Sequence, residues 1–340
     1  MTTVDERYSR QILFEKIGRD GQRKLGEGSV LVVGCGALGA AVSSLLVRAG
    51  VGALRLVDRD VVDVSNLHRQ ILFDEADVAA RLPKAEAAAR KLRAINSACR
   101  IEGLVADVTP RNVERLLDGV AVVVDGLDNF ETRYLINDAC VSRGVPWIYG
   151  GVLGAVGVTM TVLPGDGPCL RCVFPEPPPP GTLPTCDTQG VIGPAPVAVA
   201  ALEAVEACKL LLGAADVRRE LLFLDLWEGS FRGVKVSRAE QCPACGKRDF
   251  EFLRAEAHSS TVTLCGRNAV QITPAAGTTM SLERLARELA KVGQVTFNGF
   301  LLQFKSADCE LVLFPDGRAL VKGTNDPEVA RGLYARYVGT

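Results

Sequence analysis

The chain has 340 residues, of which 39 are Lys or Arg and 40 are Asp or Glu, and 48% are hydrophobic. Such a chain buries a substantial core, which excludes long-range disorder, and its formal net charge of −1 gives no sign of a general nucleic-acid-binding surface. The N-terminus lacks the apolar segment of a signal peptide, and eleven cysteines, an odd number, are typical of reduced thiols in a cytoplasm.

Strand-like and helix-like segments alternate through the first 150 residues. Strands are predicted at residues 30–33, 54–57, 101–105, 120–125 and 147–149, and helices at residues 84–95 and 131–143. This alternation predicts an α/β fold with a Rossmann-like, doubly wound and mainly parallel sheet, whose ligands gather at the carboxyl ends of the strands. Residues 149–165 alternate apolar and small side chains, which predicts that antiparallel strands continue the sheet.

Four consecutive prolines, Pro177–Pro180, follow these strands and predict a stiff, exposed connection. The apolar residues 191–213 come next and carry Glu203, Glu206 and Lys209. Because those three charges would be costly inside a bilayer, we expect a buried helix with a polar face rather than a membrane span.

A change of composition near residue 250 divides the chain into two predicted domains, residues 1–250 and residues 251–340. The second is predicted to be a small α+β domain, with helices at residues 281–293 and 326–338 and strand turns at residues 298–299 and 315–317. It contains no catalytic motif. A docking surface for a partner protein is one hypothesis for its role.

The stretch "VLVVGCGALGAAV", residues 30–42, carries the first functional signal. Gly34, Gly36 and Gly39 match the G-x-G-x-x-G turn between a strand and a helix, where backbone N–H groups and the helix dipole favour a phosphate. Asp58 stands at the end of the next predicted strand, where such folds place a carboxylate for ribose hydroxyls. A nucleotide site is therefore predicted. The same turn serves NAD, FAD and ATP, and a tight turn without a ligand is the alternative.

Two C-x-x-C pairs, Cys169 with Cys172 and Cys242 with Cys245, predict a structural zinc site. Four thiolates close a tetrahedral shell, and the spacing lets a tight turn present both sulfurs of a pair to one ion. A closed shell leaves no open coordination position, so this zinc is not expected to be catalytic. The alternatives are a redox-active dithiol, which needs only one pair, and two disulfides, which a cytoplasm disfavours.

Three further stretches carry a resemblance to a known family: "RYSRQILF" (7–14), "DRDVVDVSNLHRQ" (58–70) and "DGLDNFETRYLIN" (125–137). With the glycine turn and the cysteine pairs, they resemble the ThiF/MoeB (HesA/MoeB/ThiF) family of ubiquitin-activating-enzyme-like adenylyltransferases, in a long form with a C-terminal extension. The resemblance covers residues 5–250. It implies an enzyme that uses ATP and Mg²⁺ to adenylate the C-terminal glycine of a ubiquitin-like sulfur-carrier protein, which then receives sulfur to become a thiocarboxylate.

The resemblance also implies roles for single residues. Arg69 and Lys84 would lie against the triphosphate, and Arg10 would reach into the site from the other subunit of a homodimer. Asp58 would bind the ribose, and Asp128 would hold the magnesium ion or orient the phosphates. Pre-placed cations and Mg²⁺ suit this chemistry, because a carboxylate must approach a polyanion and pyrophosphate must leave with its charge held.

Two more residues gain a role from the resemblance. Asn66 would fix the loop that aims Arg69 and would touch the phosphates, and the loop residue Cys186, in "TCDTQGVIGP", would join the carrier covalently or take part in sulfur transfer. The alternatives are that the three basic residues are solvated surface charges and that Asp128 is a helix N-cap. The interval from Arg69 to Lys84 is slightly long for the family, so the sequence departs from the pattern at Lys84.

Two other functions remain open at this point. A NAD- or FAD-dependent oxidoreductase would use the same glycine turn, but it would leave the basic residues and the cysteine pairs without a role. It would also have only His68 and His258 as histidine proton donors. A non-catalytic scaffold that binds nucleotide and a partner is the other alternative.

The partners predicted from the resemblance are a sulfur carrier ending in Gly-Gly, a sulfur donor such as a cysteine desulfurase or sulfurtransferase, and a second copy of the chain. Neither a nucleic acid nor a membrane is expected. The carrier is not identified, because thiamin, molybdopterin, tRNA thiolation, cysteine and natural-product pathways all use such activators. The long C-terminal form favours the thiamin branch.

Overall fold

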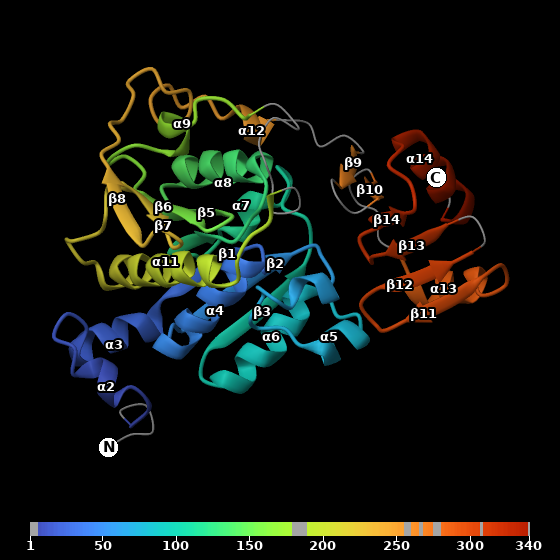
Figure 1. Cartoon of the computed structure of the whole chain (residues 1–340), viewed down its shortest axis with the longest axis horizontal. Coiled ribbons are helices and arrows are strands. Elements are labelled where there is room, and N and C mark those ends of the chain that lie inside the picture. Colours follow the sequence, from blue (N-terminus) through green and yellow to red (C-terminus); the bar gives the residue numbers. More distant parts are fainter. Residues whose placement is uncertain are drawn as a thin grey trace. The chain divides into compact units, whose positions relative to one another are not determined.

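The alternating segments of the N-terminal part form one sheet of eight strands in the computed structural model (Figure 1). The strand order is β3-β2-β1-β4-β5-β6-β7-β8. Strands β1 to β5 are parallel, and β6, β7 and β8 each run antiparallel to the strand before. The strands are β1 (Ser29–Val33), β2 (Ala53–Asp58), β3 (Arg100–Val105), β4 (Val122–Asp125), β5 (Trp147–Leu153), β6 (Val156–Val162), β7 (Leu221–Asp225) and β8 (Ser230–Val234). The predicted doubly wound sheet with an antiparallel continuation is confirmed.

The structure describes residues 6–178, 189–254, 260–264 (backbone only), 268–274, 280–306 and 309–338. These residues divide into two compact units. The first unit runs to Arg254 without Ala80–Pro83, and the second comprises Ala80–Pro83 and the described residues from Ser260 onward. The four residues beyond 250 form α12 (Glu251–Arg254), which packs on α8 in the first unit. Within the described ranges, no helix is long and apolar enough to cross a membrane.

Helices cover both faces of the eight-stranded sheet. Figure 1 shows α4, α6 and α11 on one face and α7 and α8 on the other. The remaining short helices lie at the ends and in the loops. The helices are α2 (Ser9–Ile12), α3 (Gly18–Glu27), α4 (Ala37–Ala49), the 3₁₀ turn η1 (Val64–Asn66), α5 (Glu75–Ala79), α6 (Lys84–Ile95), α7 (Val113–Leu116), α8 (Phe130–Arg143), α9 (Leu170–Val173) and α11 (Pro194–Leu212).

Helix α11 differs from its sequence prediction in one respect. The expected buried helix is present, but Glu203 and Glu206 do not form a solvated polar face, since their exposed fractions are only 0% and 4%. The helix packs against α4 and across β5 and β6, so the side that carries the two glutamates meets protein, while Val205 on another side of the helix is 53% exposed. Two acidic side chains are therefore inside the core.

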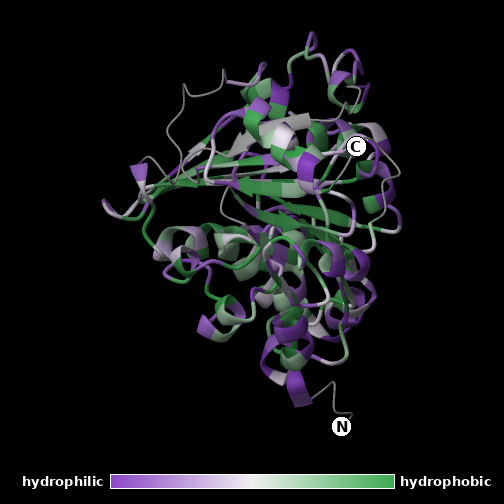
Figure 2. Ribbon diagram, turned by 90° about the vertical axis from the view of Figure 1, so that its right-hand side faces the viewer, coloured by the Kyte–Doolittle hydropathy of each residue, from purple (hydrophilic) through white to green (hydrophobic). Residues whose placement is uncertain are grey.

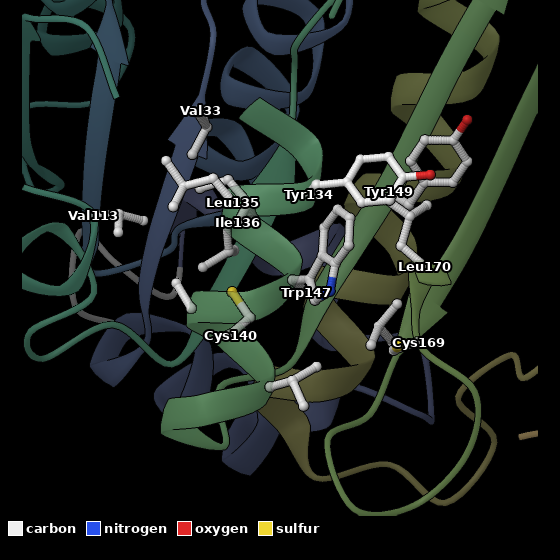
Figure 3. Close-up of a cluster of buried hydrophobic side chains, with 14 of the residues drawn as sticks. Val33, Val113, Tyr134, Leu135, Ile136, Cys140, Trp147, Tyr149, Cys169 and Leu170 are labelled. Carbon is white, nitrogen blue, oxygen red and sulfur yellow. The ribbon is translucent and has the colours of Figure 1, made fainter. Parts of the chain in front are cut away.

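The core on the α8 face joins the sheet to the cysteine-rich end of the first unit. Figure 3 shows Tyr134 of α8 close to Trp147 and Tyr149 of β5, with Cys169 and Leu170 at the edge of the same cluster. Figure 2 shows the strands as the most hydrophobic part of the ribbon. A strand buried on both faces reads as a continuous apolar run, which is why β1 and β4 were predictable.

The second unit has its own antiparallel sheet in the order β11-β12-β13-β14-β10-β9. Its core is formed around Phe304, Leu313 and Val321, with none of the core residues of the first unit. The predicted turns at residues 298–299 and 315–317 join β11 to β12 and β13 to β14. The elements are β9 (Ser260–Leu264), β10 (Ala269–Thr273), α13 (Leu282–Leu289), β11 (Gln294–Phe297), β12 (Leu302–Lys305), β13 (Glu310–Leu313), β14 (Ala319–Lys322) and α14 (Pro327–Tyr337).

Because the two cores share no residue, we expect the Phe304→Ala variant to destabilise the second unit alone. Phe304 is 0% exposed, and loss of a buried Phe side chain costs about 3–5 kcal/mol. Calorimetry should show one unfolding transition lowered by more than about 10 °C, with the other unchanged. Val292→Ala, at a residue that is 61% exposed, is the control and should shift neither. A shift of both transitions by Phe304→Ala would show that the cores unfold as one.

Candidate functional site

The carboxyl ends of β1, β2 and β4 carry most of the predicted nucleotide residues. β1 pairs with β2 on one side and β4 on the other, and the connections from β1 and β4 leave the sheet at neighbouring points. This reversal of strand order is where open α/β sheets bind ligands. The glycine turn after Val33, the carboxylate of Asp58 and the loop after Asp125 therefore share one edge of the sheet.

The glycine turn is packed against the loop after β4. Gly34 has a φ of +90°, which favours glycine, and a Cβ there would lie 2.6 Å from the Gly126 carbonyl oxygen. A Cβ at Gly39 would lie 1.8 Å from the Gly34 carbonyl oxygen, so the start of α4 needs a bare backbone. Gly36 is different, because the nearest atom to a Cβ there is 3.7 Å away. A side-chain methyl group at position 36 would therefore meet only ordinary van der Waals contacts.

Asp58 ties the glycine turn to the end of β2. Its carboxylate accepts hydrogen bonds from the backbone N–H groups of Cys35 and Asp60, each at 2.6 Å. Burial raises the pKa of Asp58, while the nearby Lys84 ammonium lowers it. Lys84, at the start of α6, is 4% exposed and forms an ion pair with Asp60 at 3.0 Å. The fold thus brings Lys84 to the Asp58 loop despite the long interval from Arg69.

Asn66 and Arg69 lie in the loop between β2 and α5. Asn66 is buried, its side-chain oxygen accepts the Asp63 N–H at 3.2 Å, and its carbonyl accepts the Arg69 N–H at 3.1 Å. The Arg69 guanidinium donates to the Ser65 carbonyl at 2.9 Å and lies 2.8 Å from the His68 ring. Asn66 therefore braces the turn that carries Arg69.

Asp128 lies exposed in the loop after β4, immediately before α8. The helix N-cap is Asn129, whose side-chain oxygen accepts the Thr132 N–H at 2.9 Å, so the N-cap alternative for Asp128 is wrong. Arg59, which forms an ion pair with Asp107, also has an electrostatic interaction with Asp128. Neither Arg59 nor Asp107 stands in a recognisable spacing, so the sequence carries no signal that pairs them.

A buried ion pair holds the loop after β4 that carries Asp128. Asp125 at the end of β4 accepts the Arg133 Nε–H at 2.7 Å, and both side chains are almost fully buried. Arg133 also donates to the carbonyls of Leu127 and Gly150 at 2.6 and 2.7 Å. Asp125 accepts the Leu127 N–H at 2.8 Å. The pair thus holds the residue before Asp128 at both its N–H and its carbonyl.

The loop that carries Arg69 is also packed against the start of α11. A Cβ at Gly193, the residue before α11, would lie 2.7 Å from the His68 carbonyl oxygen. Cys186 lies outside the described residues, so the structure does not place its thiol. Arg10 is described, and it is exposed on α2, which packs on α3. The predicted roles of Arg10 and Cys186 therefore stay predictions.

The two C-x-x-C pairs come together as the spacing predicted. The sulfur atoms of Cys169 and Cys242 are 3.6 Å apart, those of Cys172 and Cys245 are 3.4 Å apart, and all four lie within 4.8 Å of one another. A tetrahedral zinc ion with Zn–S bonds of about 2.3 Å separates its sulfurs by about 3.8 Å. The cluster therefore has the size of a zinc site.

One backbone group points at the sulfurs of the cluster. The N–H of Ala239 donates to the Cys172 sulfur at 3.5 Å. Hydrogen bonds from the neighbouring thiols lower the pKa of Cys172, while the pKa values of Cys169 and Cys245 are raised by hydrogen bonds and burial within the same cluster. After the second pair, the N–H groups of Gly246 and Lys247 donate to the Cys242 carbonyl, which closes the tight turn. Cys169 follows β6 and Cys242 follows β8, so an ion here would join two distant parts of the chain.

The arrangement as a whole combines a glycine turn, two basic side chains and an exposed carboxylate at one sheet edge. Backbone N–H groups with Arg69 and Lys84 offer positive charge to a polyphosphate, and Asp128 offers an oxygen ligand of the kind that Mg²⁺ prefers. No described histidine or cysteine lies in a pair that could act as base and nucleophile at this edge. The chemistry that fits is nucleotide binding with charge stabilisation.

Comparisons with known proteins identify relatives of this chain. Residues 8–244 match the model of the ThiF family. The chain is 45% identical over 336 residues to the sulfur carrier protein ThiS adenylyltransferase of Bacillus subtilis (strain 168), covering 98% of this chain and 99% of that protein. It is 44% identical over 247 residues to the sulfur carrier protein adenylyltransferase of Thermus thermophilus, covering 71% of this chain and 90% of that protein.

A solved structure shows the same fold. The crystal structure of E. coli MccB with ATP aligns with a TM-score of 0.62 at 24% identity, over 71% of this chain and 74% of the MccB chain. At this level of identity the likeness concerns the fold alone. It agrees with the predicted fold class.

The glycine turn can be tested with two substitutions only three residues apart. Gly39→Ala places a methyl group on the Gly34 carbonyl, so we expect a loss of about 3 kcal/mol or more in the free energy of unfolding. The methyl group of Gly36→Ala would make only ordinary van der Waals contacts, at 3.7 Å or more, so this substitution should cost less than about 1 kcal/mol. Urea denaturation followed by fluorescence measures both. Equal losses would contradict the close contact between the turn and the start of α4.

Proposed function

The chain belongs to the ThiF family, and we propose that it is an ATP-dependent adenylyltransferase that activates the C-terminal glycine of a ubiquitin-like sulfur-carrier protein. The observation that carries the proposal is the 45% identity to a ThiS adenylyltransferase, which extends over 98% of this chain and 99% of that relative. The alignment includes the C-terminal extension as well as the family region. We therefore favour a ThiS-like carrier of the thiamin branch over the other carriers.

The site supports this reaction through charge placed in advance. The carrier's glycine carboxylate attacks the α-phosphate of ATP, the bond to the β-phosphate oxygen breaks, and pyrophosphate leaves. Arg69 and Lys84 would face the triphosphate, and the glycine turn would let the backbone approach it. Because Lys84 is held by Asp60 and Arg69 by the Ser65 carbonyl, both cations are positioned before substrate binds.

Asp58 and Asp128 would bind the two ends of the nucleotide. Asp58, anchored on the Cys35 N–H, stands where the fold places a ribose-binding carboxylate. The exposed carboxylate of Asp128 would hold Mg²⁺ or orient the phosphates. When bound, Mg²⁺ neutralises phosphate charge and assists the departure of pyrophosphate.

The cysteine cluster would hold a structural zinc ion. Cys169, Cys172, Cys242 and Cys245 supply four sulfurs, which closes the shell and leaves no position for substrate. Zinc there would fix the end of β6 to the segment after β8. It would stabilise the antiparallel half of the sheet without a part in catalysis.

The remaining partners follow from the same proposal. A homodimer would let Arg10 of one subunit enter the site of the other, which is consistent with its exposed position on α2. A cysteine desulfurase or sulfurtransferase would donate the sulfur that turns the acyl adenylate into a thiocarboxylate, with Cys186 as the residue for a covalent or sulfur-transfer step. We place the reaction in the cytoplasm. The relatives named above are adenylyltransferases, so the oxidoreductase alternative has no support from them.

Carrier-dependent exchange of labelled pyrophosphate into ATP tests the proposed function. We expect exchange with a carrier that ends in Gly-Gly and none with a carrier that lacks the last glycine. Asp128→Asn and Arg69→Ala should each lower kcat/KM by about 100-fold or more, because each removes a charge that stabilises the transition state. Asp20→Asn and Arg23→Ala, at exposed positions on α3, are the controls and should match the parent.

Two results would count against this proposal. Absence of exchange together with NADH oxidation would favour an oxidoreductase. Binding of ATP by the parent without any exchange or NADH oxidation would favour a scaffold that binds nucleotide without catalysis.

Metal analysis tests the cysteine cluster. We expect about one zinc ion per chain, and we expect Cys242→Ser to lose it and to lower the unfolding temperature of the first unit by about 10 °C or more. Cys309→Ser, in the second unit, should keep both the zinc and the stability. Because protons compete for the thiolates, zinc should be released on acidification. A parent protein without zinc, or a Cys242→Ser variant that retains it, would exclude this site.

A further inference from the structure

Glu203 is a fully buried acid that the proposed reaction does not use. It lies in the middle of α11, it is 0% exposed, and neither of its carboxylate oxygens has a hydrogen-bond partner among the described residues. The next acid on the same helix, Glu206, is also buried, but its oxygens accept the Lys209 ammonium and the Arg218 N–H, each at 2.8 Å. An ionised carboxylate without partners is among the most costly groups to bury, so Glu203 needs an explanation that Glu206 does not.

The carboxyl group of Glu203 lies directly on Gly150 of β5. A Cβ at position 150 would be only 2.0 Å from the Glu203 Oε1 atom, so the carboxyl occupies the space that a side chain would need. The Gly150 peptide belongs to the network described above, since its carbonyl accepts from Arg133 at 2.7 Å and its N–H points to Asp125 at 3.4 Å. Glu203 is therefore packed on the peptide that the ion pair holds.

The groups that face Glu203 decide its protonation. They come from three elements: Asp125 on β4, Arg133 on α8 and Tyr149 on β5. The single positive charge of Arg133 is already matched by Asp125. Burial first, and then the negative charge of Asp125, raise the pKa of Glu203 well above its usual range, and Arg133 only partly opposes them. Glu203 is thus harder to ionise in the folded protein than an ordinary glutamate.

The same ion pair leads from Glu203 to the nucleotide site. Arg133 donates to the Leu127 carbonyl at 2.6 Å and Asp125 accepts the Leu127 N–H at 2.8 Å, and Leu127 directly precedes Asp128. A second carboxylate beside Asp125 would compete for Arg133. Any shift of Arg133 toward α11 would then weaken its hydrogen bond to the Leu127 carbonyl.

We propose that Glu203 is a positioning residue for the nucleotide site and that it works as a neutral carboxylic acid. With its proton it fills the space over Gly150 and leaves Arg133 to Asp125 and Leu127. When that proton passes to solvent at alkaline pH, the Glu203 carboxylate attracts the Arg133 guanidinium. The hydrogen bond from Arg133 to the Leu127 carbonyl then weakens, and the loop that carries Asp128 is held less firmly. The stability part of this proposal stands alone, and the nucleotide part rests on the proposed function.

Thermal unfolding of the full chain between pH 5.5 and 8.5 tests the protonation. The folded state holds the Glu203 proton to a higher pH than the unfolded state, so the parent loses stability as pH rises through this window. Glu203→Gln keeps the shape and cannot ionise. The difference between the unfolding temperatures of Glu203→Gln and the parent should therefore grow, in favour of the variant, by about 5 °C or more from pH 5.5 to pH 8.5. Glu203→Met provides a second variant that does not titrate.

Binding of Mg-ATP, measured by calorimetry without any carrier, tests the positioning role. From pH 7.5 to 9.5 the parent should lose about tenfold in ATP affinity, whereas Glu203→Gln should lose less than about twofold. Glu206→Gln is the matched control on the same helix, and its loss of affinity should follow that of the parent.

The outcomes separate the two parts. If the difference between the unfolding temperatures of Glu203→Gln and the parent does not change with pH, the proposal that Glu203 is protonated in the folded protein is wrong. A difference that widens while the ATP affinities of parent and Glu203→Gln fall together would leave Glu203 a structural residue only and overturn the positioning role. ATP binding without carrier-dependent exchange would contradict the proposed function and leave the Glu203 result standing.

Discussion

The buried ion pair between Asp125 and Arg133 is the interaction on which the candidate nucleotide site depends. It joins the end of β4 to α8, and through the Gly150 carbonyl it also joins both to β5. Removing one partner of such a pair leaves an uncompensated charge and costs about 3–5 kcal/mol. The pair therefore determines the path of the chain from Asp125 to the start of α8, and with it the place of Asp128.

The glycine turn and the ion pair act on the same loop from opposite sides. Gly34 is packed on the Gly126 carbonyl, while Arg133 holds the next residue, Leu127. Asp58 fastens the other side of the turn by accepting the Cys35 N–H. Little room is left for the turn to move, so a phosphate that binds there meets backbone groups already in place. Preorganised groups of this kind stabilise charge without a cost of rearrangement during the reaction.

Much of this could be predicted because the relevant signals are local. A strand followed by spaced glycines reads directly as a turn before a helix, and each C-x-x-C pair is a local turn whose partner was predictable from ligand number. The contacts of Lys84 with Asp60 and of Arg59 with Asp107 were not predictable in this way. These ion pairs join residues that are 24 and 48 positions apart, and no periodicity records them. The burial of Glu203 and Glu206 on α11 was not predictable for a related reason. A 3.6-residue pattern shows which residues share a face of a helix but not whether that face meets solvent.

The sequence by itself determined the order of the elements, the glycine turn and the four cysteines. Each depends on residue types at short spacing and on the alternation of buried strands with amphipathic helices. Only the tertiary structure decided that Asn129 rather than Asp128 caps α8, and that Arg133 is held by Asp125. It also decided that the Glu203 carboxyl group is enclosed with no hydrogen-bond partner among the described residues. The physical reason is that the cost of burying a charge depends on which groups from other elements surround it, and those groups come together only when the sheet and helices pack.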